Sequence, residues 1–255
     1  MSLRDILLSD DPVAVLRNLD ATHKLRELEP TLADLRMDIP KGYHHKDNLT
    51  HSLKVLENAI QRETTVDLVL RTAALFHDVG KPATRKFHDK GLVTFDGHET
   101  VGARMVKKIL VKHGYSKPEI AEISKLVAFH MRSHGFTEQK WTDSAVRRLI
   151  TEVGDDAVMA RLLVVFYADV TTRFPEKRKN LHRAVDALKE KMDEVASLDA
   201  RKALRPSLSG HDIMELFSLT PGRELGAIMK FLNSDEGIVL SREDAIQAVK
   251  DKFFT

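Results

Sequence analysis

The sequence contains no cysteine and carries almost no net charge. The lack of cysteine excludes disulfide bonds, thiolate metal sites and a cysteine nucleophile, and it leaves metal chemistry to histidine, aspartate and glutamate. Lysine and arginine total 40 against 38 aspartates and glutamates, so the formal net charge is only +2. No overall charge draws the chain to nucleic acid or to a membrane, and an anionic substrate would have to be met by local groups.

Long apolar runs are also missing. No stretch approaches the length of a membrane span, and the first residues, from Met1 to Asp5, lack the apolar core of a signal peptide. These absences predict a soluble cytoplasmic protein without a membrane partner. What the chain does have is 42% hydrophobic residues in a length of 255, enough for one large domain with a smaller appendage.

Apolar residues recur at helical spacing through most of the chain, between short turn signals. Helix starts are predicted at Asp11-Pro12, Pro118, Thr142 and Asp155 from their capping side chains and first-turn prolines. One small β-hairpin is predicted where residues 84–87 and 92–95 flank a turn that contains Gly91. A further turn is predicted at residues 39–43.

The C-terminal third contains a long amphipathic helix from Pro175 to Leu198, followed by three short helices. We interpret the lysines and arginines of the long helix as a solvated face, because acidic residues are interspersed among them. The predicted fold class is therefore all-α, a helical bundle with one small β-hairpin and a C-terminal helical appendage. The predicted boundaries are a lead-in at residues 1–40, a central metal-binding domain at 41–200 and the appendage at 201–255.

The pair His77-Asp78 ends an apolar run. Residues 66–79 leave almost no polar face, which is typical of a buried helix. A buried imidazole and a buried carboxylate need strong compensating partners, and one divalent metal ion satisfies both. Gly80 and Pro82 are expected to stop the helix there and to leave an open side.

Five segments, 20 to 39 residues apart, each place a metal-compatible side chain inside a helix or at its boundary. A single histidine on an apolar helix is more typical of a satisfied core residue, but the set as a whole suits iron, manganese, zinc, cobalt, nickel or magnesium. Six ligands exceed the need of one ion, so we expect one or two ions, with Asp78 as the bridge if there are two. In the alternative, two of the histidines bind substrate phosphate or water near a single ion. The candidate metal ligands are His51, His77, Asp78, His98, His130 and Asp169.

The order histidine, His-Asp, distant aspartate resembles the HD superfamily of metal-dependent phosphohydrolases. Residues 48–53, 77–85, 97–99, 141–148 and 208–214 are similar to the C-terminal half of bacterial tRNA nucleotidyltransferases, the CCA-adding enzymes. The resemblance implies a phosphohydrolase that acts on a nucleotide or another small phosphorylated substrate, including 2′,3′-cyclic phosphates, with the tRNA 3′ end as a candidate partner.

The printed sequence contains no Asp-x-Asp pair, the metal-binding carboxylates of the nucleotidyltransferase half in the family it resembles. We therefore expect no nucleotide addition. Two other functions stay open on this evidence. One is a binding module for tRNA or a protein partner, working beside a separate nucleotidyltransferase. The other is a di-iron oxygenase, because the superfamily it resembles includes such enzymes.

Residues near the candidate ligands supply the remaining predictions. Asp78 is assigned a catalytic role as the bridging ligand. Lys81 is assigned to catalysis and to substrate binding, because it could hold a phosphate oxygen. Its alternative is an ordinary cation at a helix end. Weaker candidates for substrate binding, each with a solvated surface role as the alternative, are Arg104, Arg132 and Arg147.

Overall fold

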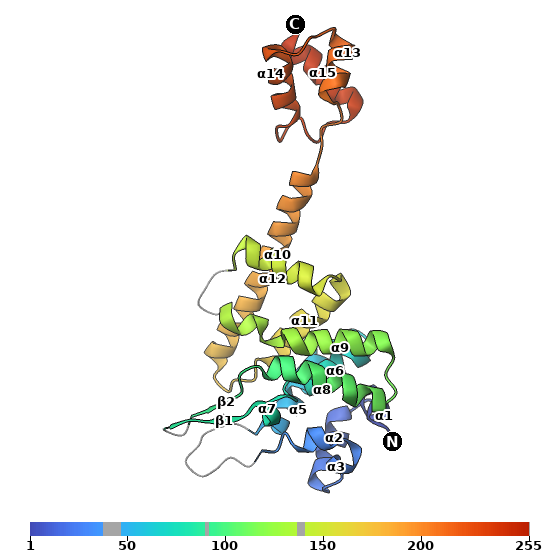
Figure 1. Cartoon of the computed structure of the whole chain (residues 1–255), viewed down its shortest axis with the longest axis vertical. Helices are drawn as coiled ribbons and strands as arrows, with labels where there is room; N and C mark the ends of the chain where they lie inside the picture. The colour runs from blue at the N-terminus through green and yellow to red at the C-terminus, as the bar shows by residue number, and fades with distance from the viewer. Residues whose placement is uncertain (38–46, 90–91, 137–140, 255) are drawn as a thin grey trace. The chain divides into compact units, whose positions relative to one another are not determined.

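The computed structural model describes residues 1–37, 47–89, 92–136 and 141–254, and it is built almost wholly of helices (Figure 1). The described residues form one antiparallel pair of strands, β1 (Lys86–Phe87) and β2 (Val93–Thr94). The predicted all-α class with one hairpin is confirmed, but each strand has two residues rather than four. Neither strand has a buried residue, so burial of apolar side chains does not stabilise a longer ladder. The predicted turn at residues 39–43 and the predicted tip at Gly91 lie outside the described residues.

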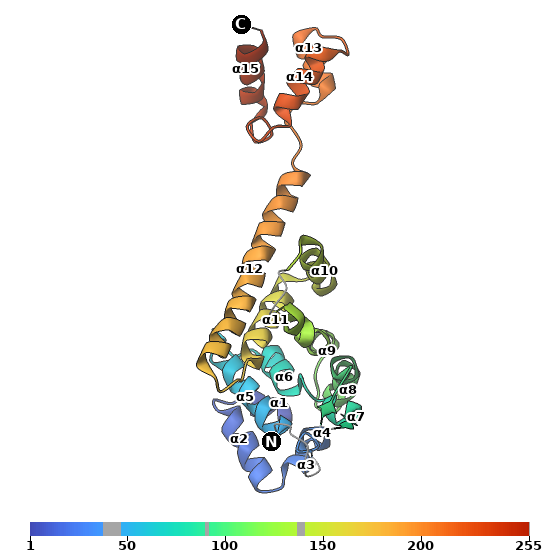
Figure 2. The same ribbon diagram turned by 90° about the vertical axis from the view of Figure 1, so that its left-hand side faces the viewer.

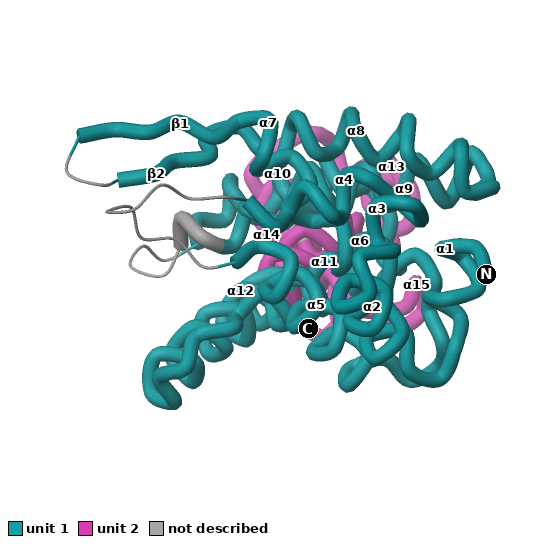
Figure 3. Tube along the Cα trace, turned by 90° about the horizontal axis from the view of Figure 1, so that it is seen from below, with its two compact units in different colours: residues 1–192 teal, residues 193–255 magenta. Residues whose placement is uncertain are grey.

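The chain divides into two compact units, Met1–Met192 and Asp193–Thr255, which Figure 3 colours separately. The N-terminal helices belong to the first unit, and Arg71 shows one reason. Its buried guanidinium donates hydrogen bonds to the backbone oxygens of Leu7 at 2.7 Å and Ser9 at 3.0 Å, and it pairs with Glu63. These bonds tie the first helices to the centre of the unit. The helices are α1 (Leu3–Leu8), α2 (Pro12–Ala21), α3 (Leu25–Leu28) and α4 (Pro30–Ala33).

The centre of the first unit is α6 (Leu68–Phe76), which is buried on nearly every side between α5 (Asn48–Ile60), α9 (Lys117–Phe129) and α11 (Asp156–Asp169), as Figure 2 shows. The predicted caps are present. Thr142 caps α10 (Asp143–Val153), and Asp155 caps α11 through the backbone N–H groups of Ala157 and Val158. The remaining elements of this region are α7 (Lys81–Thr84), α8 (His98–Lys112) and the 3₁₀ helix η2 (His130–Phe136).

The long basic helix, α12, spans Pro175–Ala203, five residues further than predicted. Three short helices follow, as predicted: α13 (Gly210–Phe217), α14 (Arg223–Leu232) and α15 (Arg242–Phe253). They enclose their own small core, which includes Ile213, Ile228 and Leu232. Within the described residues, each helix is too short or too polar to cross a bilayer.

A second His-Asp dipeptide, His211-Asp212, lies in the first turn of α13, and it is used differently from the first. The Asp212 carboxylate accepts a hydrogen bond from the backbone N–H of Ser209 at 2.8 Å, forms a capping box with that residue and pairs with Arg242 at 2.7 Å. Its role is to start a helix.

Candidate metal centre

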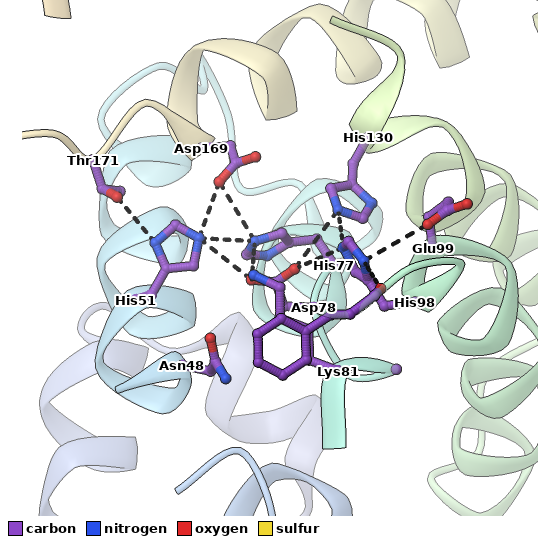
Figure 4. A network of polar contacts seen from close by, with 12 residues as sticks. Asn48, His51, His77, Asp78, Lys81, His98, Glu99, His130, Asp169 and Thr171 are labelled. Carbon is purple, nitrogen blue, oxygen red and sulfur yellow. Dashed lines mark hydrogen bonds and ion pairs between the residues drawn. The ribbon is translucent and has the colours of Figure 1, made fainter. Parts of the chain in front are cut away.

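The six candidate ligands come from five helices, and Figure 4 shows their side chains pointing toward one another. Four of the six stand at helix ends. His77 is the C-cap of α6 and His130 the C-cap of α9, while His98 opens α8 and Asp169 closes α11. Asp78 follows directly on the end of α6, and His51 lies in the first turn of α5. The structure therefore brings together every residue that the sequence proposed as a ligand.

The first ligand group consists of His51, His77, Asp169 and the Oδ2 atom of Asp78. The two Nε2 atoms of its histidines are 3.2 Å apart. His51 Nε2 lies 3.0 Å from Asp169 Oδ1 and 3.5 Å from Asp78 Oδ2, and His77 Nε2 lies 3.6 and 3.2 Å from the same two oxygens. Ligand atoms about 2.1 Å from one metal would be about 3.0 to 3.4 Å apart in octahedral or tetrahedral geometry. The observed spacing fits a single ion.

The second ligand group consists of His98, His130 and the Oδ1 atom of Asp78. The Nε2 atoms of the two histidines are 3.2 Å apart, and they lie 3.2 and 3.7 Å from Asp78 Oδ1. Asp78 thus presents one carboxylate oxygen to each group. A carboxylate in this position can bridge two ions, as the sequence suggested.

Backbone oxygens fix the protonation of three of the histidines. The Nδ1 atoms of His77, His98 and His130 each lie 2.7 to 2.9 Å from the carbonyl oxygen three residues earlier. A carbonyl oxygen can only accept a hydrogen bond, so each Nδ1 carries a proton. The Nε2 atom of each ring therefore points into the cluster, and it offers a lone pair there when the ring is neutral. His51 Nδ1 lies 3.0 Å from the hydroxyl of Thr171 instead.

This arrangement is itself a test of whether a metal fits. Neutral His98 and His130 would face each other with two Nε2 lone pairs 3.2 Å apart and no hydrogen between them, beside a carboxylate oxygen. Such a contact is repulsive unless a cation shares it. Imidazole nitrogens with carboxylate oxygens are a donor set for divalent transition metals, so the residues fit the ion that the sequence implied.

The electrostatics of the cluster favour the same conclusion. Burial opposes ionisation of Asp78, but in the metal-free cluster the positive charge of a protonated His77 and hydrogen bonding with the neighbouring histidines hold the pKa of Asp78 well below its usual range. The pKa of Asp169 is also lowered, because a hydrogen bond from His51 and the charge on His77 outweigh burial. Both carboxylates are therefore ionised at neutral pH.

Without a metal, the pKa values of His77 and His130 shift in opposite directions. Burial tends to lower the pKa of His77, but the charges of Asp78 and Asp169 outweigh it, and the pKa of His77 is raised. Burial lowers the pKa of His130. A proton on His77 can thus partly replace a metal cation in the first ligand group.

Two glycines allow the His-Asp segment to reach α8. Gly80 packs so closely on that helix that a Cβ atom would lie 2.1 Å from the carbonyl oxygen of His98 and 2.7 Å from the backbone nitrogen of Gly102. The backbone of Gly80 is in the ordinary right-handed region, with φ −77° and ψ −15°. The helix that carries the His-Asp pair does end in this segment, at Phe76, and Gly80 is the N-cap of α7. Glycine is needed there for close approach, and this approach sets His98 beside Asp78.

A cavity of about 940 Å³ opens onto the cluster. Lys81 lines it, with Nζ 2.6 Å from Asp78 Oδ2, at the start of α7 rather than at a helix C-terminus. The three arginines proposed for substrate binding do not line it. Arg104 is exposed on α8, while Arg132 pairs with Glu152 at 2.8 Å and Arg147 with Asp143 at 3.8 Å, in partly exposed ion pairs.

Three residues that line the cavity were not singled out as site residues from the sequence. Asn48 is 2% exposed, and it stands three residues before His51, a spacing that puts both on one face of α5. Trp141, the single tryptophan, precedes the α10 cap. Lys177, on α12, was interpreted as part of a solvated face. The helical spacing of Asn48 to His51 was a usable signal, but nothing in the local sequence indicates that α12 faces the cluster.

Comparison with known proteins finds one family model and two curated relatives that are similar to this chain. The model of the HD domain matches residues 48–173, a range that contains all six candidate ligands. The chain is 30% identical over 234 residues to an A-adding tRNA nucleotidyltransferase of Deinococcus radiodurans, covering 88% of this chain and 52% of the relative. It is 31% identical over 249 residues to a CC-adding tRNA nucleotidyltransferase of Thermus thermophilus, covering 95% and 54%. The chain spans about half the length of these relatives.

Proposed function

The chain carries an HD domain and is homologous along most of its length to tRNA nucleotidyltransferases, and we propose that it is a metal-dependent phosphohydrolase acting on a nucleotide or another phosphate ester. The observation that carries the proposal is Asp78, whose two carboxylate oxygens face two separate groups of nitrogen and oxygen ligands. A binding scaffold would have no need of a buried bridging carboxylate beside four converging histidines.

The charges that line the cavity indicate how an anionic substrate would be admitted. Among the described residues, four carboxylates line it, Asp78, Asp96, Glu99 and Asp169, against the two lysines Lys81 and Lys177. With neutral histidines, the formal charge of these six side chains is −2. One divalent cation brings that charge to zero, and two bring it to +2. Binding of a phosphate ester should therefore depend on metal even before any chemical step.

The protein's own residues supply the rest of the site. His51, His77, Asp78 and Asp169 would hold one ion, and Asp78, His98 and His130 the second. A bound divalent ion would supply a water of lowered pKa and charge neutralisation at the phosphoryl oxygens. Lys81, whose Nζ lies 2.6 Å from Asp78 Oδ2, would hold a phosphate oxygen at the same side of the cluster. These roles make hydrolysis, including that of 2′,3′-cyclic phosphates, the reaction that the site supports best.

A second candidate is a binding role at the 3′ end of tRNA. The two named relatives add nucleotides to tRNA, and the similarity extends beyond the HD range into α12 and the second unit. In this case the chain would position an RNA end without hydrolysing it, and the metal would have a structural role.

The test is a hydrolysis assay on protein stripped with a chelator and reloaded in turn with manganese, nickel, cobalt, iron, zinc or magnesium. The substrates are 4-nitrophenyl phosphate, its bis-ester and 2′,3′-cyclic nucleotides. We expect turnover of at least one ester only after reloading, and loss of it in Asp78→Asn. Absence of turnover with every metal, together with tight binding of a tRNA 3′ end, would favour the binding role.

A further inference from the structure

We propose that Lys177 binds a second phosphoryl group of the substrate, remote from the reacting one, and that the enzyme thereby selects nucleotides that carry two phosphates. This inference rests on the proposed phosphohydrolase function and names the substrate class for the same site. It concerns a residue of α12, which lies beyond the range that matches the HD domain.

The two lysines that line the cavity differ in their partners. Lys81 is neutralised by Asp78, with 2.6 Å between Nζ and Oδ2, and only 17% of its side chain is exposed. Lys177 is exposed, and among the described residues it has no carboxylate partner and no hydrogen bond to a side chain. The positive charge of Lys177 is therefore available to a ligand, whereas that of Lys81 is already shared.

The position of Lys177 is set by a well-anchored helix. The residues of α12 that line the cavity recur three or four apart and so share one face of the helix. Val185 and Leu188 on this face are buried, and Asp186 on the neighbouring face accepts a hydrogen bond from the hydroxyl of Tyr167 in α11. Lys177 is the N-terminal member of this face, and the other cavity-lining residues of α12 are apolar and cannot bind an anion.

The position of Lys177 in its helix is electrostatically unfavourable. It is the third residue of α12, and a cation in the first turn of a helix is disfavoured by the helix dipole. Glu176 beside it reduces that cost but does not form an ion pair with it in the structure. Binding of an anion from the cavity would offset this cost and would account for a lysine at this position.

The cavity is large enough to hold two binding points. Its volume of about 940 Å³ is near the upper end of the range of about 300 to 1,000 Å³ for small-molecule sites. A single phosphoryl group at the metal cluster would leave most of it empty. Among the described residues Lys177 forms no hydrogen bond or ion pair with any of the six ligands, so its charge is available to a second group of a ligand in the cavity. A nucleoside with one phosphate at the cluster and another at Lys177 would occupy both binding points.

The experiment compares two substrates that differ by one group: adenosine 2′,3′-cyclic phosphate with and without a 5′-phosphate, on metal-loaded full-length protein. We expect the wild-type kcat/KM to favour the 5′-phosphorylated compound about 3- to 10-fold. In Lys177→Gln this ratio should fall to about one. The matched control is Lys179→Gln, a substitution on the same helix outside the cavity, which should keep the wild-type ratio.

Fluorescence of Trp141, the single tryptophan and a cavity residue, gives a second readout that needs no turnover. Both nucleotides are titrated into the metal-loaded proteins. Hydrolysis with the same substrate ratio in Lys177→Gln as in wild type would overturn the role of Lys177 and leave the proposed function standing. Tighter binding of the 5′-phosphorylated compound that depends on Lys177, without hydrolysis of either, would support the subsite and refute the proposed function. Absence of both binding and hydrolysis would overturn both.

Discussion

Replacement of Asp78 by asparagine tests the bridging role most directly, because asparagine keeps the shape of the side chain and removes its charge. The first ligand group would retain His51, His77 and Asp169, while the second would retain only His98 and His130. Three protein ligands can still hold an ion, but two histidines alone do not make a stable site. We expect the metal content at saturation to fall from two ions per chain to one at most.

The effect of losing an ion can be expressed as a change in the melting temperature, Tm. An ion present at 100 times its dissociation constant stabilises the folded protein by about 2.7 kcal/mol. At roughly 2 to 4 °C per kcal/mol, each ion should raise the Tm of a unit of this size by about 5 to 11 °C. Asp78→Asn should lose at least half of the total rise that metal causes in the wild type. Metal analysis and calorimetry, each before and after chelation and reloading with manganese, measure the two quantities.

The matched control is Asp212→Asn, the same substitution in the second His-Asp dipeptide. It weakens the capping box of α13, in which Ser209 is the N-cap, and the ion pair with Arg242. We expect it to cost no more than is typical of a lost cap, about 0.5 to 2 kcal/mol, and to leave the metal content unchanged. Two ions per chain and a full metal-dependent rise in Tm in Asp78→Asn would refute the bridging role.

Three further predictions follow from the same geometry. The double variant His98→Ala, His130→Ala should bind one ion at saturation where the wild type binds two; an unchanged content of one ion in both proteins would show that the second group holds no metal. Gly80→Ala should destabilise the protein by about 1 to 3 kcal/mol in chemical denaturation, because the new Cβ atom would overlap the carbonyl oxygen of His98. The control is Gly226→Ala on α14, where a Cβ atom meets no other atom, and it should stabilise the protein by about 0.5 to 1 kcal/mol. Because the pKa of His77 is raised without metal, its proton stabilises the metal-free protein below pH 6.5, and this stability is lost as the pH rises through the raised pKa. Metal affinity should fall as the pH falls through the same window, because the proton competes with the metal. Calorimetry of the metal-free protein and metal titrations between pH 6 and 9 measure the two effects, and a metal affinity independent of pH would contradict the argument.

Helix boundaries were the most predictable part of this fold. Asp11-Pro12, Thr142 and Asp155 each begin a helix where the sequence indicated, because a capping side chain acts on the backbone of its own first turn. The convergence of the six candidate ligands was also predictable, since buried polar side chains on apolar helices need a common partner. Local sequence carries both signals.

What the sequence could not show depends on contacts between distant segments. The reason for Gly80 lies in the backbone of α8, about twenty residues away, and the role of α12 as a cavity wall depends on how that helix packs. Arg132 and Arg147 were plausible phosphate ligands until their carboxylate partners were located. In each case the deciding partner is a residue whose position only the fold determines.

The carbonyl oxygens that orient three of the histidines have a consequence for how this centre could change. His77, His98 and His130 are aligned by the main chain, which no substitution can delete, so their orientation is resistant to point mutation. His51 is aligned instead by the hydroxyl of Thr171, a side chain that one codon change can remove. Within the first ligand group, a substitution at Thr171 should therefore change the orientation of His51 without removing a ligand, whereas the orientation of His77 should persist.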